Sequence, residues 1–180
     1  MWAYFLLLIL EGALRKWVLP GLATPLLIVR DPVALWMLWE AWRRGVFPMN
    51  GYVLGAIAIT LISLMLTMLI GHGNLSVALF GARITLFHFP LMFLIGAVLK
   101  RDELLSILRA VLWIALPMAV LIALQFNSPQ SAWVNRGIGG DMEGGGFSGA
   151  MGYLRPPGTF SFTNGITQFF SLVGVCVVYF

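Results

Sequence analysis

The chain has 180 residues, of which 60% are hydrophobic and 10% are charged, whereas soluble domains average about 45–50% and about 25%. These proportions exclude a soluble globular protein, and the high hydrophobicity also excludes a disordered chain. The single cysteine, Cys176, excludes an internal disulfide framework, and no spaced set of Cys and His residues predicts a metal site. Because each crossing takes about 20 apolar residues, we expect an all-α fold, a polytopic transmembrane helical bundle of about six spans.

The spans are predicted from the apolar runs in chain order. Residues 52–70 form the clearest run, nineteen residues without a charge, which matches a hydrocarbon core about 30 Å thick. The fourth run contains Arg83 and His88, and the fifth contains Arg109 near its start, where a long side chain reaches the interface. The last run reaches the final residue, so we expect the chain to stop within a sixth, truncated span. The predicted spans are residues 2–19, 22–42, 52–70, 77–99, 104–124 and 165–180.

The positions of the basic residues predict the orientation. The net charge is +4, and because the charges lie between apolar runs they indicate topology and anion contacts rather than nucleic-acid binding. Arg43-Arg44 and Lys100-Arg101 follow the second and fourth spans, whereas the turn at 71–76 has no Lys or Arg. We therefore expect a cytoplasmic N-terminus and an extracytoplasmic connection over 125–164.

This 125–164 connection is rich in glycine, with nine glycines between Gly137 and Gly158 and with Asp141 and Glu143 among them. Such a segment either wraps a ligand with its backbone donors or serves as a flexible linker. The two acidic residues either bind a cation or are simply solvated.

The end of the connection reads Arg155-Pro-Pro-Gly-Thr-Phe-Ser-Phe-Thr-Asn-Gly165. The two prolines favour an extended backbone, and Thr163 or Asn164 is a suitable N-cap for a helix starting near Gly165. A helix N-terminus with Arg155 close by in sequence forms an anion site, or else Arg155 is an ordinary interfacial residue.

Several charged residues interrupt the apolar runs. Glu11 and Arg15 are four residues apart and share a helix face, and Arg30 can pair with Asp31 just before Pro32. These residues either form a salt-bridge network that fixes the bundle or line a cavity. Arg83 lies about two turns into its span and faces protein, water or a substrate, or else anchors the helix at the interface.

The two histidines and one pair of glycines are not assigned to the predicted site. His88 and His72 are not assigned a catalytic role. Gly51-x-x-x-Gly55 is a pattern that allows close packing of membrane helices.

Four segments of the chain resemble the N-terminal half of O-antigen ligase and O-antigen polymerase-like bacterial membrane proteins. The closest likeness is to an Arg-x-x-Gly-Thr-Phe…Asn element, which Arg155, Gly158, Thr159, Phe160 and Asn164 carry here; family members have Pro-Asn where this chain has Thr163-Asn164. The segments are EGALRKW (11–17), RDP (30–32), ARITLFHFPLMFLIG (82–96) and RPPGTFSFTNG (155–165).

The resemblance implies a glycosyltransferase of the bacterial inner membrane that needs neither metal nor cofactor. Its donor is a glycan linked to undecaprenyl pyrophosphate, and its acceptor is a hydroxyl of a second glycan or lipid. The resemblance implies that Arg155, with Arg83 as a second candidate, binds the pyrophosphate, and that Gly158, Thr159 and Asn164 shape that site. It identifies no catalytic base in this chain, so the fragment alone is expected to be inactive.

Two other classes of protein remain open. A transporter or flippase fragment would use the charges near the middle of the bilayer, namely Glu11, Arg30 and Asp31. A noncatalytic membrane scaffold would tolerate substitution at all of these positions.

Overall fold

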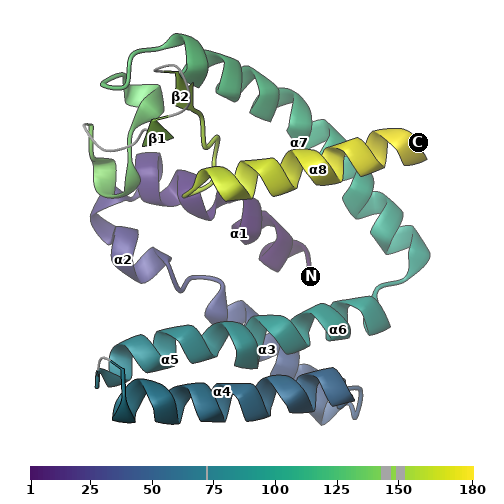
Figure 1. The fold of residues 1–180 in the computed structure, drawn as a ribbon. Helices are drawn as coiled ribbons and strands as arrows, with labels where there is room; N and C mark the ends of the chain where they lie inside the picture. Colours follow the sequence, from purple (N-terminus) through teal and green to yellow (C-terminus); the bar gives the residue numbers. More distant parts are fainter. Residues whose placement is uncertain (72, 143–146, 149–152) are drawn as a thin grey trace. The chain divides into compact units, whose positions relative to one another are not determined.

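The computed structural model describes residues 1–71, 73–142, 147–148 and 153–180. It confirms the predicted all-α class (Figure 1). The described chain divides into two compact units, one formed by Asp31–Leu99 together with Met1 and the other by Trp2–Arg30 together with Lys100–Phe180. His72 and Glu143, both considered above, lie outside the described residues.

The unit that contains both the N-terminal and the C-terminal segments has three main helices. Helix α1 spans Trp2–Ala13 and continues directly into a π-helical segment, η1, at Leu14–Val18. Helix α7 spans Arg101–Asn127 and α8 spans Thr163–Tyr179. The shorter elements are a 3₁₀ turn at Pro20–Leu22, helix α2 at Ala23–Leu26, 3₁₀ turns at Trp133–Asn135 and Ile138–Gly140, and the antiparallel pair β1 (Phe147–Ser148) and β2 (Leu154–Arg155).

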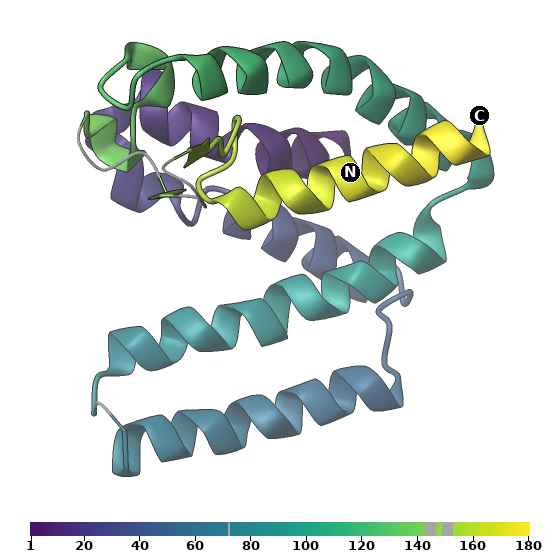
Figure 2. The same ribbon diagram turned by 45° about the horizontal axis from the view of Figure 1, so that its top comes forward.

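The core of this unit forms where α1, α7 and α8 pack together. Helices α7 and α8 contribute to the same core, and their ribbons converge toward the C-terminal end of α8 in both views (Figures 1 and 2). Asp102 and Glu103 occupy the first turn of α7, where a carboxylate is favoured by the helix dipole. The buried apolar residues of this core are Ile9, Val111, Ala115, Met118, Ile166, Phe169 and Cys176.

The second unit is built from four helices. They are α3 (Asp31–Arg43), α4 (Gly51–Leu69), α5 (Leu75–Arg83) and α6 (Phe89–Val98). Helices α5 and α6 are joined by a second π-helical segment, η3, at Ile84–His88. Asn50 and Asn74 cap α4 and α5, since their side-chain oxygens accept backbone N–H groups of the first helical turn. Inside the unit, Thr60 on α4 donates a hydrogen bond to Thr85 of η3.

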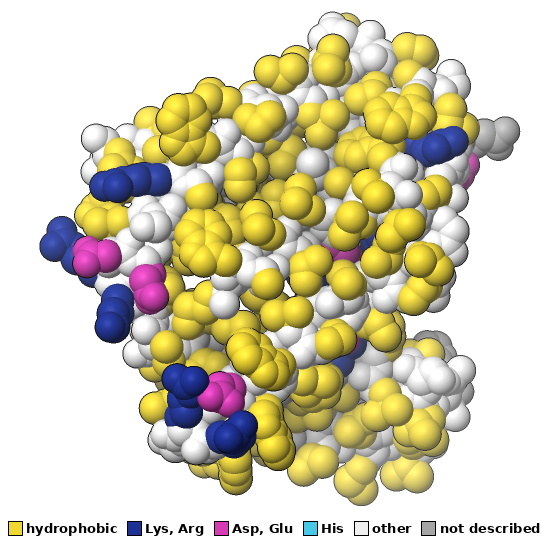
Figure 3. Space-filling view, turned by 180° about the vertical axis from the view of Figure 1, so that it is seen from behind, with side chains coloured by type: hydrophobic (Ala, Val, Ile, Leu, Met, Phe, Trp, Pro, Cys, Tyr) yellow, Lys and Arg dark blue, Asp and Glu magenta, His cyan; other side chains and the backbone are white. Residues whose placement is uncertain are grey.

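Much of the apolar side-chain area is exposed, as a protein surrounded by lipid requires. Trp113, Ile70 and Val178 are 73%, 79% and 89% exposed, and hydrophobic side chains cover most of the face drawn in Figure 3. Within the described residues, four helical stretches are long and apolar enough to cross a membrane: Pro20–Arg43, Gly51–Leu69, Leu75–Val98 and Arg101–Asn127. The chain is thus an α-helical membrane protein, and the number of crossings stays a prediction.

Two local expectations are wrong. Helix α8 begins at Thr163, and its N-cap residue is Phe162, which provides no side-chain cap; Thr163 and Asn164 already belong to the helix because the extended backbone ends at Phe162. Gly51 and Gly55 make no close helix contact with the described residues, since a Cβ atom built at either position meets nothing within 4 Å there.

Candidate functional site

The segment that follows β2 is locked against the end of α1 by a close backbone contact. A Cβ atom at Gly12 would overlap backbone atoms of Thr159, Phe160 and Ser161, so only glycine permits this approach. The hydroxyl of Thr159 donates to the carbonyl oxygen of Ile9 at 2.8 Å. Two of the segments that carry the family resemblance, EGALRKW and RPPGTFSFTNG, therefore meet in one place.

Two basic side chains of η1 complete this contact. Lys16 is 1% exposed, and its Nζ donates to the carbonyl oxygens of Phe160 at 2.6 Å and Gly158 at 3.3 Å. Arg15 donates from Nε to the carbonyl of Ala23 at 2.8 Å and from a terminal nitrogen to the hydroxyl of Ser161 at 2.9 Å. These donors satisfy carbonyl groups that a loop buried against a helix would otherwise leave unpaired.

Helix α7 holds the same segment from a second direction. Gln125 is 1% exposed; its side-chain oxygen accepts the N–H of Gly158 at 2.9 Å, and its amide nitrogen donates to the carbonyl of Val134 at 3.0 Å. Gly158 has φ +59°, and a Cβ there would press on Met118 and Ile166. Neither Lys16 nor Gln125 was predicted to contact this segment; the signals available in the sequence were a charge inside the first apolar run and a polar residue directly after the fifth.

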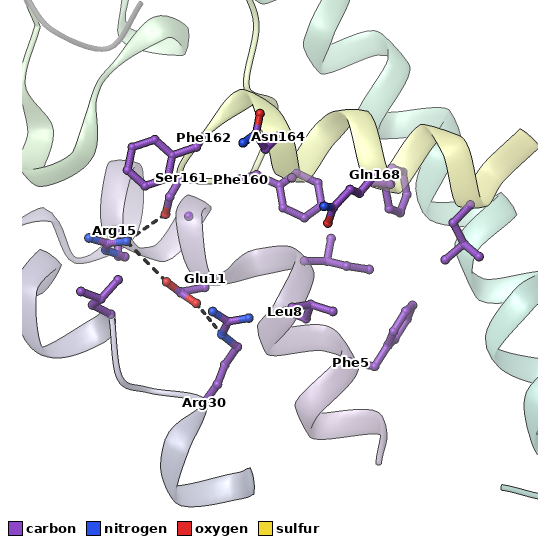
Figure 4. A pocket seen from close by; sticks show the side chains of 16 residues that line it. Phe5, Leu8, Glu11, Arg15, Arg30, Phe160, Ser161, Phe162, Asn164 and Gln168 are labelled. Carbon is purple, nitrogen blue, oxygen red and sulfur yellow. Dashed lines mark hydrogen bonds and ion pairs between the residues drawn. The ribbon is translucent and has the colours of Figure 1, made fainter. Parts of the chain in front are cut away.

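A pocket of about 500 Å³ opens beside this junction (Figure 4). Its walls are mainly apolar and come from α1, α8 and the segment between β2 and α8. At one end, Arg15, Glu11 and Arg30 gather, while Leu8 and Phe5 continue along α1 away from them (Figure 4). The pocket thus combines a charged end with an apolar remainder.

The charged end is a carboxylate held between two guanidinium groups. Glu11 is 6% exposed, and its two oxygens lie 2.7 Å from Nε of Arg30 and 3.4 Å from a terminal nitrogen of Arg15. The predicted i, i+4 pair of Glu11 and Arg15 is therefore present. The expected pairing of Arg30 with Asp31 is wrong, because each of these neighbours pairs inside its own unit.

Two amides add polar groups to the same pocket. Asn164 and Gln168 are four residues apart on α8, share a helix face and line the pocket (Figure 4). Both side chains are exposed. An exposed amide on an apolar helix is costly next to hydrocarbon unless it finds a polar partner, so these groups favour a ligand with polar atoms.

The other unit contains a separate, partly buried charge cluster. Arg83 donates to one oxygen of Asp31 at 2.9 Å, and Nε2 of His88 lies 3.1 Å from the other oxygen. Residues five apart point about 140° from one another in an α-helix. The wider π turn η3 changes this, as the N–H of Phe89 bonds to the carbonyl of Ile84, and it brings Arg83 and His88 to the same carboxylate.

The two predicted pyrophosphate residues belong to different units of the chain. Arg155 lies in β2, is exposed, and does not line the pocket. Arg83 belongs to the other unit and pairs with Asp31. Of the residues predicted to shape the site, Gly158 and Thr159 anchor the junction and Asn164 lines the pocket.

Of the two acidic residues in the glycine-rich connection, the structure describes Asp141 but not Glu143. Asp141 is exposed, and its backbone carbonyl accepts the N–H of Gly137. Among the described residues, no group of His, Cys, Asp and Glu side chains could hold a metal ion.

The fold and the exposed apolar surface define the class, an α-helical membrane protein with a charged pocket. No family model matches this chain, and no curated protein or solved structure is significantly similar to it.

Proposed function

We propose that this chain is the donor-binding part of a membrane glycosyltransferase of the O-antigen ligase and polymerase type. It would bind a glycan linked to undecaprenyl pyrophosphate at the outer face of the bacterial inner membrane, with its N-terminus in the cytoplasm and residues 125–164 outside. The observation that carries the proposal is the pocket of about 500 Å³ that joins apolar walls to the Arg15–Glu11–Arg30 group.

The chemistry of the pocket suits a lipid with an anionic head. Arginine forms directed, charge-assisted hydrogen bonds with phosphate oxygens. Amides both donate and accept, so Asn164 and Gln168 suit phosphate and sugar oxygens alike. Phe5, Leu8 and Leu172 supply apolar surface for a hydrocarbon chain.

The segment before α8 supports a preformed site. Lys16 donates to two of its carbonyls, Gln125 accepts one of its N–H groups, and Arg15 donates to its Ser161 hydroxyl, at distances of 2.6–3.3 Å. A segment fixed in this way loses little further freedom when a ligand binds, which favours affinity. We propose that the exposed Arg155 at its start contacts pyrophosphate oxygens that extend out of the pocket; Arg83 lies in the other unit and stays a separate prediction.

The proposed reaction is transfer of the glycan to an acceptor hydroxyl. The acceptor oxygen attacks the anomeric carbon, and the bond from that carbon to the pyrophosphate oxygen breaks with its electron pair remaining on the oxygen. The acceptor proton passes to a base that we do not assign in this chain. Arginine stabilises the charge that develops on the departing pyrophosphate.

The direct test is binding of the donor to the protein in nanodiscs. Arg30→Gln should weaken binding of a fluorescent undecaprenyl-pyrophosphate-linked glycan roughly tenfold or more, because a charge-assisted contact is lost. Arg44→Gln is the matched control: Arg44 also pairs with a glutamate at 2.7 Å, but outside the pocket. Equal affinities of the two variants would refute this function for the pocket.

A transporter remains the second candidate, and one observation favours it. Asp31, Arg83 and His88 form a partly buried group of ionisable side chains inside predicted spans, and such groups commonly mark ion or proton pathways. Proteoliposomes that accumulate a lipid-linked glycan or take up protons with the wild-type protein, but not with Asp31→Asn, would support transport. A scaffold would show neither donor binding nor flux.

A further inference from the structure

Glu11 is the one acidic residue among those that line the pocket, and its position is unusual for a site that receives an anion. Its carboxylate is buried and lies between the guanidinium groups of Arg15 and Arg30. It therefore repels the same phosphate that the two arginines attract. A purely attractive anion site would not contain this group.

The two arginines differ in how firmly they are held. Arg15 also donates to the carbonyl of Ala23 and to the hydroxyl of Ser161, so its guanidinium is fixed. For Arg30, Glu11 is the partner that the described part of the chain provides, and the Arg30 side chain is 23% exposed. A phosphate entering the pocket would therefore bind to Arg30 and share it with Glu11.

Formal charge makes this sharing selective. Arg15, Arg30 and Glu11 leave the lined pocket with one net positive charge. In the proposed reaction the donor's pyrophosphate is esterified at both ends, whereas the departing lipid pyrophosphate has a free terminal phosphate. Because the second pKa of a phosphate monoester is about 6, that product carries more negative charge at pH 7.

We propose that Glu11 is a specificity-determining residue that disfavours the more highly charged lipid pyrophosphate relative to the glycosylated donor. This inference rests on the proposed function of the same pocket. The Glu11 charge weakens binding of both ligands, but it weakens binding of the product more, and it thereby promotes product release. Like charges a few ångströms apart in a site of low polarity interact strongly enough for this discrimination.

The test uses two probes with the same tail. Farnesyl pyrophosphate represents the product, and its terminal methyl ester represents the donor, with methyl in place of the glycan. Their affinities are measured on the whole protein in phosphatidylcholine nanodiscs, which add no competing anionic lipid. The preference is the affinity for the free pyrophosphate divided by the affinity for the ester.

Glu11→Gln keeps the shape of the side chain and removes its charge. We expect this variant to shift the preference toward free pyrophosphate by about fivefold or more, as a like charge within the site predicts. Glu40→Gln is the control, since Glu40 pairs with Arg44 at 2.7 Å outside the pocket, and it should leave the preference unchanged.

A second pair of variants covers the case in which Glu11→Gln does not fold because Arg30 has lost its carboxylate partner. Arg30→Gln and the double variant Glu11→Gln/Arg30→Gln differ only in the Glu11 charge. The double variant should show the same shift in preference relative to Arg30→Gln.

The outcomes separate the two levels of the proposal. If both probes bind and neither pair shifts the preference, Glu11 is only a structural brace and this inference is wrong while the pocket's function stands. If the methyl ester does not bind the wild-type protein, the proposed function of the pocket fails, and the inference fails with it.

Discussion

The Nζ atom of Lys16 lies 2.6 Å from the carbonyl oxygen of Phe160, a residue 144 positions further along the chain. This contact joins η1, which continues α1, to the segment that precedes α8. A buried lysine needs acceptors to offset its desolvation, and here backbone carbonyls provide them. The candidate site is therefore supported by a polar contact between the first and last parts of the sequence.

Removing that ammonium group should destabilise the unit that contains it. Lys16→Met keeps much of the side-chain volume but leaves the carbonyls of Phe160 and Gly158 without their donor. We expect a loss of about 1–3 kcal/mol, seen as a lower midpoint of thermal unfolding in detergent. Lys100→Met, at an exposed lysine before α7, should leave the midpoint nearly unchanged; equal midpoints for the two variants would contradict the assignment.

The close approach at Gly12 gives a test of backbone packing. Gly12→Ala should push the segment of Thr159 and Phe160 away from α1, lowering both thermal stability and donor binding. Gly55→Ala is the matched control, because it places the same methyl group in open space on a helix. That change should be neutral or stabilising by about 0.5–1 kcal/mol. A Gly12→Ala protein as stable as the Gly55→Ala protein would disprove the contact.

The cluster around Asp31 predicts a large effect from a single carboxylate. Asp31→Asn leaves the guanidinium of Arg83 without the anion that it contacts at 2.9 Å. Losing a charge-assisted hydrogen bond in a partly buried position costs about 1.5–3 kcal/mol, so this variant should unfold at a lower denaturant concentration. By contrast, Glu40→Gln breaks pairs with Arg43 and Arg44, whose side chains are 66% and 71% exposed, and it should cost at most about 1 kcal/mol.

Arg155 gives the test of the predicted pyrophosphate contact. In an active enzyme that contains this chain, Arg155→Lys should reduce glycan transfer roughly tenfold or more, because an ammonium group cannot replace a two-pronged guanidinium contact. Because Arg155 is exposed, the variant should retain the wild-type unfolding midpoint. Unchanged transfer would remove Arg155 from the proposed site.

The orientation is tested by labelling single cysteines. A cysteine at Ser148 should react with an impermeant maleimide added to intact cells, whereas one at Gly45 should react only after the cells are opened. The native Cys176 is buried and gives little background. Labelling at Gly45 and protection at Ser148 would invert the predicted topology.

Some contacts of the site followed from the sequence because they are local. The pairing of Glu11 with Arg15 needs only the regular spacing of a helix, and it is present. The pairing of Arg30 with Asp31 was expected only because the two residues are adjacent in sequence, and it is wrong. Arg30 instead pairs with a residue 19 positions earlier, and Asp31 pairs with one 52 positions later.

By itself, the sequence determined that this is an all-α membrane protein, because long apolar runs must satisfy their backbone hydrogen bonds within helices. Only the tertiary structure decided which charges meet. The η3 turn brings Arg83 and His88 to Asp31, and the lack of a side chain at Gly12 admits the segment that Lys16 then fixes. Such contacts depend on the local helix type and on chain segments far apart in sequence, and neither is encoded in the spacing of apolar residues.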